Sequence, residues 1–406
     1  MQTIRHHIQR LGAFFWIPFI LSLIGLLVLF SSTSTSGPGN QSVFKKQVIW
    51  LCAGWGLYVL FLRIPGQFLI QSSYVLYGMT LLLLILLFPF GSGPAGRWLE
   101  LGPIRVQPSE IAKLFTILAI ARCLSADQEG RIPGIRYLLA LFLSLIPAVL
   151  TLVQPDAATA LTFVFICGAA VFWAGMRVRI WFFLGIVMIA GLTGVSVTAS
   201  VIFFGLFVLV VILRYRTFPM MGFVLFCALI NRMIPRLLMY AKPYQLDRLR
   251  IFFGLKTDPL GSAYQVIQSK IAIGSGGFFG KGFLQGSQTQ LRFLPEQHTD
   301  FIISVLGEEF GFLGILIVLG LFFWYLFRIL QVAETIQNRW AGYVVFCAGI
   351  LLFLHILINM GMTVGLIPVM GLPLPFFSYG GSSLCTILSL AGLIGNSYLG
   401  QRSYSI

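Results

Sequence analysis

Long apolar segments, separated by short polar or basic stretches, occupy most of this 406-residue chain. A helix that crosses a membrane needs roughly 20 mostly apolar residues, because the bilayer core offers no water to the backbone. The pattern therefore predicts an all-α polytopic integral membrane protein. The segments expected to span are Gly12–Phe30, Val48–Leu62, Phe68–Phe88, Ile111–Ala126, Tyr137–Val153, Ala157–Gly175, Phe312–Leu330, Ala341–Val364 and Ser382–Leu399.

The region from Ile180 to Arg232 is also apolar, but it is too long for a single span. Arg214 and Arg216 divide it, and arginines beside a span favour the cytoplasmic side. With these two arginines inside, about three spans fit here, which predicts an extra helix pair within residues 180–235 and twelve spans in total. The alternative is ten spans, with part of this region lying flat at the membrane interface.

Basic residues at alternate connections set the expected orientation. If the N-terminus is cytoplasmic, the connections after even-numbered spans should be basic, and they are. Both termini are therefore expected in the cytoplasm, with the first segment kept as a span rather than cleaved as a signal peptide. The residues that set this orientation are Arg63, Arg122, Arg131, Arg136, Arg177, Arg179, Arg328, Arg339 and Arg402.

Composition excludes a soluble protein and gives no support to nucleic-acid binding. Hydrophobic residues make up 58% of the chain and charged residues 10%, whereas a soluble domain carries about 25% charged residues. The net charge of +15 is spread over the connections and forms no continuous basic face. The six cysteines lie in apolar segments without ligand spacing, so neither a disulfide framework nor a zinc site is expected.

The one long polar segment, residues 236–309, is expected to be a large extracytoplasmic loop. Nine Lys or Arg residues lie between Arg232 and Arg292, on the side that membrane topology normally leaves poor in positive charge. They form either an ordinary solvated loop or a surface for an anion such as phosphate. The glycine-rich run from Gly274 to Gly282 favours the second interpretation, because glycine lets the backbone approach a ligand closely. It lacks the spacing of a nucleotide-binding P-loop.

Several motifs occur in order along the chain and together resemble the RodA, FtsW and SpoVE family of shape, elongation, division and sporulation (SEDS) proteins. The segment Gly282–Gln288 is more similar to the elongation-type RodA branch than to the division-type FtsW branch. One departure is Ala157-Ala158, where the family usually has Leu-Gly after Gln-Pro-Asp. The motifs are Gly96–Leu99, Gln107–Lys113, Tyr264–Lys270, Phe293–Phe301, Gly307–Gly311, Asn359–Gly361 and Pro368–Ser383.

The resemblance implies one SEDS-type membrane domain over residues 1–406, with ten core helices, and a peptidoglycan glycosyltransferase in the bacterial cytoplasmic (inner) membrane. Such an enzyme polymerises lipid II during elongation and releases undecaprenyl pyrophosphate. It works with a class B penicillin-binding protein, a transpeptidase, and with other elongation-complex membrane proteins. The alternatives are a lipid II flippase, a division-type polymerase and a non-catalytic scaffold. An external acidic motif and few charges at the membrane midplane favour the enzyme over the flippase.

The resemblance makes Asp300 the candidate catalytic carboxylate. A carboxylate can accept the proton of an attacking sugar hydroxyl, and it can also hold a metal ion. The departing pyrophosphate needs positive charge, from side chains or from a divalent cation such as Mg²⁺ or Mn²⁺. The structural alternative is that Asp300 only stabilises the start of a helix through the helix dipole.

Eight further residues are candidates for substrate binding. Glu110 and Lys113 are three residues apart on one helix face, and form either a structural ion pair or part of a substrate cavity. Asp156 either caps a helix or lines the same cavity. Arg97, Lys270 and Lys281 are candidate pyrophosphate contacts or solvated charges, and Glu296 and His298 flank Asp300.

Two further expectations concern the last third of the chain. Pro373, Pro375, Gly380 and Gly381 are expected to break a helix near the membrane surface and to shape the groove. His355 lies in an apolar segment and is expected to contact another helix.

Overall fold

The computed structural model describes residues 11–34, 38–93, 96–102, 104–125, 133–175, 263–291 and 293–400, with a few isolated positions between 202 and 251. The chain forms two compact units, Met1–Ala174 together with Thr257–Ile406, and Gly175–Lys256. The helices below belong to the first unit. The expected helix pair within residues 180–235 and the first part of the expected 236–309 loop lie outside the described residues.

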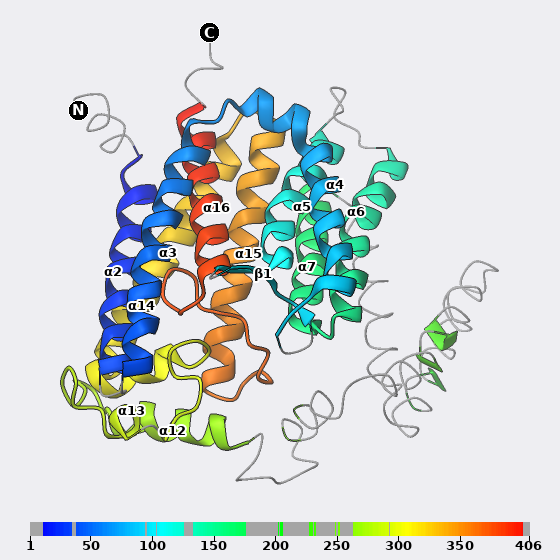
Figure 1. The fold of residues 1–406 in the computed structure, drawn as a ribbon. Coiled ribbons are helices and arrows are strands. Elements are labelled where there is room, and N and C mark those ends of the chain that lie inside the picture. Colours follow the sequence, from blue (N-terminus) through cyan, green and yellow to red (C-terminus); the bar gives the residue numbers. More distant parts are fainter. Residues whose placement is uncertain are drawn as a thin grey trace. The chain divides into compact units, whose positions relative to one another are not determined.

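Each of the nine predicted segments is a helix (Figure 1). Six of these helices are long and apolar enough to cross a membrane, namely α2, α4, α6, α14, α15 and α16, and α7 is apolar but shorter. The prediction of an all-α polytopic membrane protein is confirmed. The nine helices are α2 (Ala13–Ser34), α3 (Pro38–Arg63), α4 (Gly66–Phe90), α5 (Pro108–Ser125), α6 (Gly134–Val153), α7 (Ala157–Trp173), α14 (Ile302–Thr335), α15 (Arg339–Thr363) and α16 (Gly381–Gly400).

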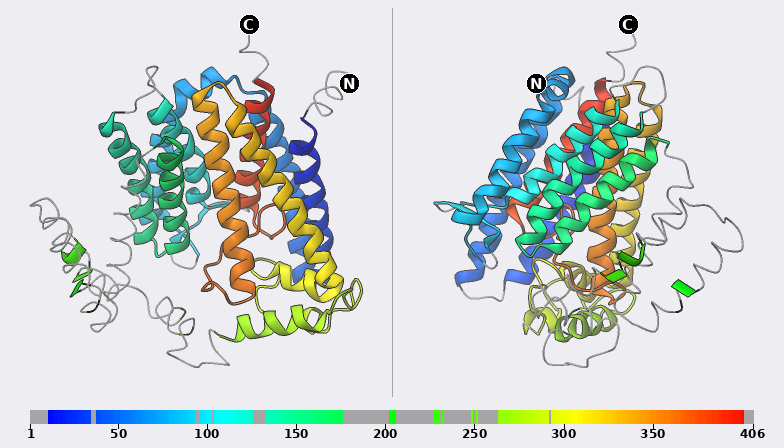
Figure 2. Two further views of the ribbon diagram at one scale, coloured as in Figure 1. Left: turned by 180° about the vertical axis from the view of Figure 1, so that it is seen from behind. Right: turned by 90° about the vertical axis from the view of Figure 1, so that its right-hand side faces the viewer.

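Two short helices, α12 (Tyr264–Ser275) and α13 (Ser287–Gln290), lie at one end of this bundle, which we call the site end, and a hairpin joins α4 to α5. A short antiparallel hairpin of β1 (Leu99–Leu101) and β2 (Ile104–Val106) leads into α5. The helix α12 crosses below α14 and α15 in both views of Figure 2, and the single turn α13 lies beside it. Ser269 fixes α12 there, because its Oγ contacts Ser304 Oγ at 2.7 Å and the Thr363 carbonyl at 2.6 Å.

The segment between α15 and α16, residues 364–380, turns back into the bundle. Its Phe377 packs against Gly25 of α2, where a Cβ would lie 2.7 Å from the Phe377 Cα. Gly25 is nine residues from the end of α2, so this contact lies about 13 Å inside the bundle. Irregular backbone is tolerated at membrane depth only where protein covers it, and Phe376 and Phe377 are both buried.

This depth corrects the expectation that Pro373 and Pro375 break a helix near the membrane surface. The break lies well inside, against the middle of α2 and α14, because the helix α16 begins only at Gly381. Phe322 of α14 contacts the Phe377 ring at 6.2 Å between ring centroids. The second half of the segment, residues 374–378, is therefore buried inside the bundle, below the site end.

The start of α14 also differs from the prediction of a span beginning at Phe312. The helix begins at Ile302 and is broken at Gly311, which has a φ of 68° and a ψ of −165°. The glycine-rich run packs against this break. A Cβ at Gly276 would lie 2.0 Å from the Gly307 carbonyl, and one at Gly280 would lie 2.2 Å from the Glu309 carbonyl. These glycines are therefore required by close contact with the protein's own backbone.

Candidate active site

Asp300 lies two residues before α14, at the site end, and is half-buried. Its backbone N–H donates to the Glu296 carbonyl at 3.1 Å, and its carbonyl accepts from Asn359 Nδ2 at 3.1 Å. The carboxylate lies beside Gly371, where a Cβ would be 3.5 Å from Asp300 Oδ2. The candidate carboxylate thus faces the segment that turns back into the bundle.

Glu296 and His298 shape the turn that carries Asp300. Glu296 has a φ of 52° and its carbonyl accepts the backbone N–H groups of Thr299, Asp300 and Phe301. Its carboxylate is exposed and accepts from Thr299 Oγ1 at 3.0 Å. A non-glycine residue at positive φ costs about 1–3 kcal/mol, and such positions are frequent at functional sites.

His298 connects this turn to the segment below it. Its carbonyl accepts the backbone N–H of Tyr379 at 2.9 Å, and its ring centroid lies 5.9 Å from that of Tyr379. Burial lowers the pKa of His298, and the nearby Glu296 opposes that shift. The imidazole is therefore neutral at pH 7, where it can donate or accept a hydrogen bond.

Glu110 and Lys113 form a buried ion pair, with Lys113 Nζ 2.8 Å from Glu110 Oε1. Lys113 Nζ also lies 3.2 Å from His355 Nε2, and His355 Nδ1 lies 3.1 Å from the Pro373 carbonyl. His355 is fully buried between helices, which confirms its expected role as a helix contact. These contacts are those expected of a structural ion pair. Through His355 the pair is also linked to Pro373, in the segment that Asp300 faces.

Asp156 caps α7, because its Oδ1 accepts the backbone N–H of Thr159 at 3.2 Å. Its other oxygen, Oδ2, accepts from Gln107 Nε2 at 3.3 Å and lies 3.9 Å from Arg97 Nη1. The guanidinium of Arg97 also donates to the Gln154 carbonyl at 2.9 Å. Arg97 and Asp156 are therefore brought together, with Arg97 holding the turn before α7.

The two candidate lysines of the outer loop have different surroundings. Lys270 is exposed on α12, and its ammonium lies over Gly365, where a Cβ would be 2.7 Å from Nζ. Lys281 instead pairs with the fully buried Glu308 at 2.8 Å. Glu308 lies in α14, eight residues after Asp300, which corresponds to about two helical turns. Lys270 thus remains the more available cation.

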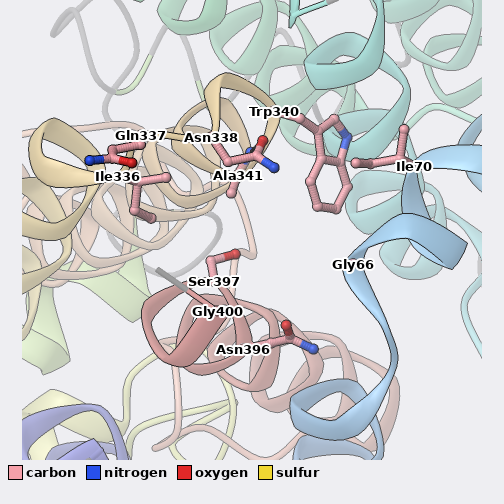
Figure 3. Close-up of a pocket in the computed structure, with 10 residues that line it drawn as sticks. All are labelled: Gly66, Ile70, Ile336, Gln337, Asn338, Trp340, Ala341, Asn396, Ser397 and Gly400. Carbon is pink, nitrogen blue, oxygen red and sulfur yellow. Dashed lines mark hydrogen bonds between the residues drawn. The ribbon is translucent and has the colours of Figure 1, made fainter. Parts of the chain in front are cut away.

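Within the described ranges, no three His, Cys, Asp or Glu side chains gather in a way that could hold a metal ion. Asp300 as a metal ligand therefore stays a prediction. A small pocket lies at the other end of the bundle, opposite the site end, and none of the candidate residues lines it (Figure 3). Its lining residues are Gly66, Ile70, Ile336, Gln337, Asn338, Trp340, Ala341, Asn396, Ser397 and Gly400.

Comparison with known proteins identifies the family. Residues 12–399 match the FtsW/RodA/SpoVE family model, which is described as a cell cycle protein. The chain belongs to this family. The family predicted from the sequence motifs is thereby confirmed, and the match covers nearly the whole chain.

Relatives over nearly the full length are peptidoglycan glycosyltransferases by name. The Escherichia coli K12 protein MrdB is 33% identical over 390 residues, covering 95% of this chain and 94% of MrdB. Treponema pallidum RodA is 33% identical over 416 residues, covering 92% and 94%. A probable FtsW of Thiomicrospira cyclica is 35% identical over 393 residues, covering 94% and 90%.

Solved structures agree with this assignment. One chain from a structure on the coordination of polymerization and crosslinking by a peptidoglycan synthase complex has a TM-score of 0.69. It is 29% identical, and the match covers 97% of both chains. The crystal structure of the Thermus thermophilus rod shape determining protein RodA has a TM-score of 0.62 at 25% identity and covers 96% of both chains. The structural similarity thus covers nearly the whole chain.

Two side chains of this family member were not singled out from the sequence. Asn359, part of a quoted motif, contacts Asp300 directly, and Glu308 holds Lys281. The available signal was a polar side chain in an otherwise apolar segment, since intramembrane polar groups are candidates for function. For Asn359 that signal was strengthened by His355 one turn before it.

Proposed function

We propose that this protein is a peptidoglycan glycosyltransferase that polymerises lipid II into glycan strands during cell elongation and releases undecaprenyl pyrophosphate. The observation that carries this proposal is the position of Asp300. Its half-buried carboxylate lies at the site end, next to Gly371 of the segment that turns into the bundle. The names of the full-length relatives give the same activity.

Asp300 serves as the general base in this proposal. Its carboxylate accepts the proton of a sugar hydroxyl on one substrate as that oxygen attacks the anomeric carbon of the other. The new glycosidic bond forms while the bond from that carbon to the pyrophosphate oxygen breaks. The leaving pyrophosphate carries the electron pair and the negative charge away.

Positive charge stabilises that leaving group. Lys270 is the cation we assign first, because it is exposed on α12. Glu296 and His298 shape the turn that carries Asp300. Five further residues hold the surrounding elements in place through the contacts described above, namely Arg97, Lys281, Glu110, Lys113 and Asp156. A divalent cation such as Mg²⁺ or Mn²⁺ at Asp300 would supply additional charge and polarise the leaving phosphate.

The protein is a multi-pass membrane protein, and we place it in the bacterial cytoplasmic membrane with both termini inside. The site end then faces outward, where lipid-linked disaccharide is polymerised. We propose a class B penicillin-binding protein as its partner, since a related chain belongs to a peptidoglycan synthase complex that coordinates polymerization and crosslinking. The other proposed partners are lipid II and further membrane proteins of the elongation complex.

The polar groups inside the bundle are the observation that would support the flippase alternative. Transporters place binding groups near the membrane midplane. Here Lys113 is fully buried and is held by Glu110 and His355, so its charge is already compensated within the protein. This arrangement favours a structural role for the pair, and the enzyme remains the better-supported proposal.

Replacement of Asp300 by Asn tests the proposal. Asp300→Asn keeps size and most hydrogen bonding but removes the basic oxygen, so the polymerisation rate should fall about 10²–10⁴-fold. Yield, thermal stability in detergent and co-purification with the transpeptidase should stay near wild type. The measurement is polymerisation of purified lipid II. A folded Asp300→Asn protein that works at the wild-type rate would remove Asp300 from the mechanism.

A further inference from the structure

One carboxamide joins the backbone of Asp300 to the segment that its carboxylate faces. Asn359 Nδ2 donates to the Asp300 carbonyl at 3.1 Å and to the Leu372 carbonyl at 2.8 Å. Leu372 directly follows Gly371, beside which the Asp300 carboxylate lies. Both hydrogens of a single amide group therefore fix the two sides of the candidate site relative to each other.

The Asp300 carbonyl lies at the entry to α14. Phe301 is the N-cap of α14, so Asp300 lies just outside the helix, and its carbonyl takes no part in the helical hydrogen bonds. The N–H of the same peptide group, that of Phe301, donates to the Glu296 carbonyl at 3.3 Å, and the bond from Asn359 holds the carbonyl side. Asn359 is fully buried, so water cannot replace it easily.

The side chain of Asn359 is held in place by the two hydrogen bonds that its Nδ2 donates. Its Oδ1 is buried and meets no hydrogen-bond donor among the described residues. Leaving a buried carbonyl oxygen without a donor costs free energy, and the two bonds donated by Nδ2 offset that cost. The two donated bonds are therefore the reason for an amide at this position.

A second contact from the same helix face anchors the Leu372 side of this arrangement. His355, one turn before Asn359 on α15, reaches the carbonyl of the next residue, Pro373, at 3.1 Å. His355 in turn contacts Lys113 of α5 at 3.2 Å. Two consecutive carbonyls are thus bound to α15, so the segment that Asp300 faces is held by a rigid helix.

We propose that Asn359 is the positioning residue of Asp300, and that it fixes the carboxylate relative to residues 371–373 for glycosyl transfer. This inference rests on the proposed role of Asp300 in the reaction. Asn359 does not touch the substrate in this proposal. Its loss should displace Asp300, and a displacement of about 1 Å at a reacting group can lower the rate about 10²-fold.

The same chain offers a matched control at the opposite end of the bundle. Asn396 of α16 also donates from Nδ2 to two backbone carbonyls, those of Phe61 at 2.9 Å and Ile64 at 2.6 Å. Figure 3 shows Asn396 there, at the wall of the small pocket. Asn396→Leu removes the same kind of interaction as Asn359→Leu, but far from Asp300 along the helices.

The experiment compares Asn359→Leu, Asn396→Leu, Asp300→Asn and the Asp300→Asn, Asn359→Leu double variant in the full-length protein. Initial rates are measured over a range of lipid II concentrations, together with the thermal unfolding midpoint. We expect Asn359→Leu to lower kcat about 10–100-fold. The half-saturating concentration should change less than about threefold, because ground-state binding is retained. Asn396→Leu should lower the unfolding midpoint similarly while kcat stays within about twofold.

The double variant separates positioning from general damage. If Asn359 acts through Asp300, adding Asn359→Leu to Asp300→Asn should reduce the rate no further. Losses that multiply, or an Asn359→Leu kcat equal to that of Asn396→Leu, would overturn the inference. Should Asn359→Leu not fold, Asn359→Ser, which is too short to reach both carbonyls, is measured in the same way. A fully active Asp300→Asn protein would remove Asp300 from the mechanism and would overturn this inference with it, whereas a wild-type protein that forms no polymer from lipid II would refute the proposed function itself.

Discussion

Glu308 shows how strongly single buried residues organise this protein. Its carboxylate is fully buried and receives five donors from the loop at 281–289. Lys281 Nζ and the Gln288 N–H reach Oε1 at 2.8 Å each, and Ser287 Oγ lies at 3.2 Å. The N–H and Oγ1 of Thr289 reach Oε2 at 3.0 Å and 2.8 Å. A buried carboxylate with this many donors anchors the loop to α14.

This arrangement leads to different predictions for the two outer lysines. Lys281→Gln removes the charged partner of Glu308, so the free energy of unfolding should fall by about 1–3 kcal/mol. Lys270→Gln removes an exposed charge and should leave stability unchanged while raising the lipid II concentration needed for half the maximal rate. Unfolding midpoints and initial rates measure both effects. If Lys281→Gln altered only the lipid II dependence, Lys281 would be a substrate contact rather than an anchor.

The sequence predicted some of these side-chain contacts and could not predict others. Glu110 and Lys113 are three residues apart on one helix, so their pairing follows from helix geometry. Lys281 and Glu308 are 27 residues apart in the sequence, and Lys113 contacts His355 of a different helix. No local rule gives such contacts. The motif resemblance made Asp300 a candidate, but it could not reveal that Asn359 donates to the Asp300 carbonyl.

At the scale of elements, the glycine-rich run and the broken start of α14 fit together as one unit. Gly311 adopts a φ of 68°, and a Cβ there would lie 2.3 Å from the Gly280 N. The backbone N–H groups of Lys281 and Gly282 donate to the carbonyls of Glu308 and Glu309 at 3.0 Å each. These bonds satisfy helix carbonyls that the break at Gly311 would leave without partners.

Two glycine-to-alanine variants test this unit. In Gly280→Ala the new Cβ would lie 2.2 Å from the Glu309 carbonyl at a φ of 83°, so the loop must move. We expect a loss of about 1–3 kcal/mol in unfolding free energy. Gly274→Ala is the control, because nothing lies within 4 Å of its Cβ in α12. It should be neutral or stabilise by up to about 1 kcal/mol. Equal midpoints for both variants would contradict the packing described here.

The elements themselves were well predicted because each span is a long apolar segment, a signal that a single sequence carries strongly. The sequence did not predict how deeply the segment between α15 and α16 enters the bundle. Pro373 and Pro375 indicated a break after α15, but the distance that residues 364–380 travel into the bundle depends on packing against other helices. Gly25 leaves room for Phe377 at that depth, and no property of residue 25 alone indicates this.

At the scale of the whole molecule, the first unit constrains how often the chain crosses the membrane. The start of α7 lies at the site end, because Ala158 packs with Leu372. Its other end lies away from the site, where Trp173 stacks on Phe346 at 4.2 Å between ring centroids. The chain therefore leaves α7 at one membrane face and reaches α12 at the other. The predictions of ten and of twelve spans place one and three crossings between these two helices, in a part of the chain that lies outside the described residues.

We predict three crossings, with Arg214 and Arg216 cytoplasmic, although these positions lie outside the described residues. The reason is that arginines next to short connections stay on the inner side. In a cysteine-free background, Tyr215→Cys should resist a membrane-impermeant thiol reagent in intact cells and react only after permeabilisation. Phe279→Cys is the matched outer control, because Phe279 is 77% exposed at the site end. Labelling of position 215 from outside, at a rate similar to that of position 279, would exclude this topology.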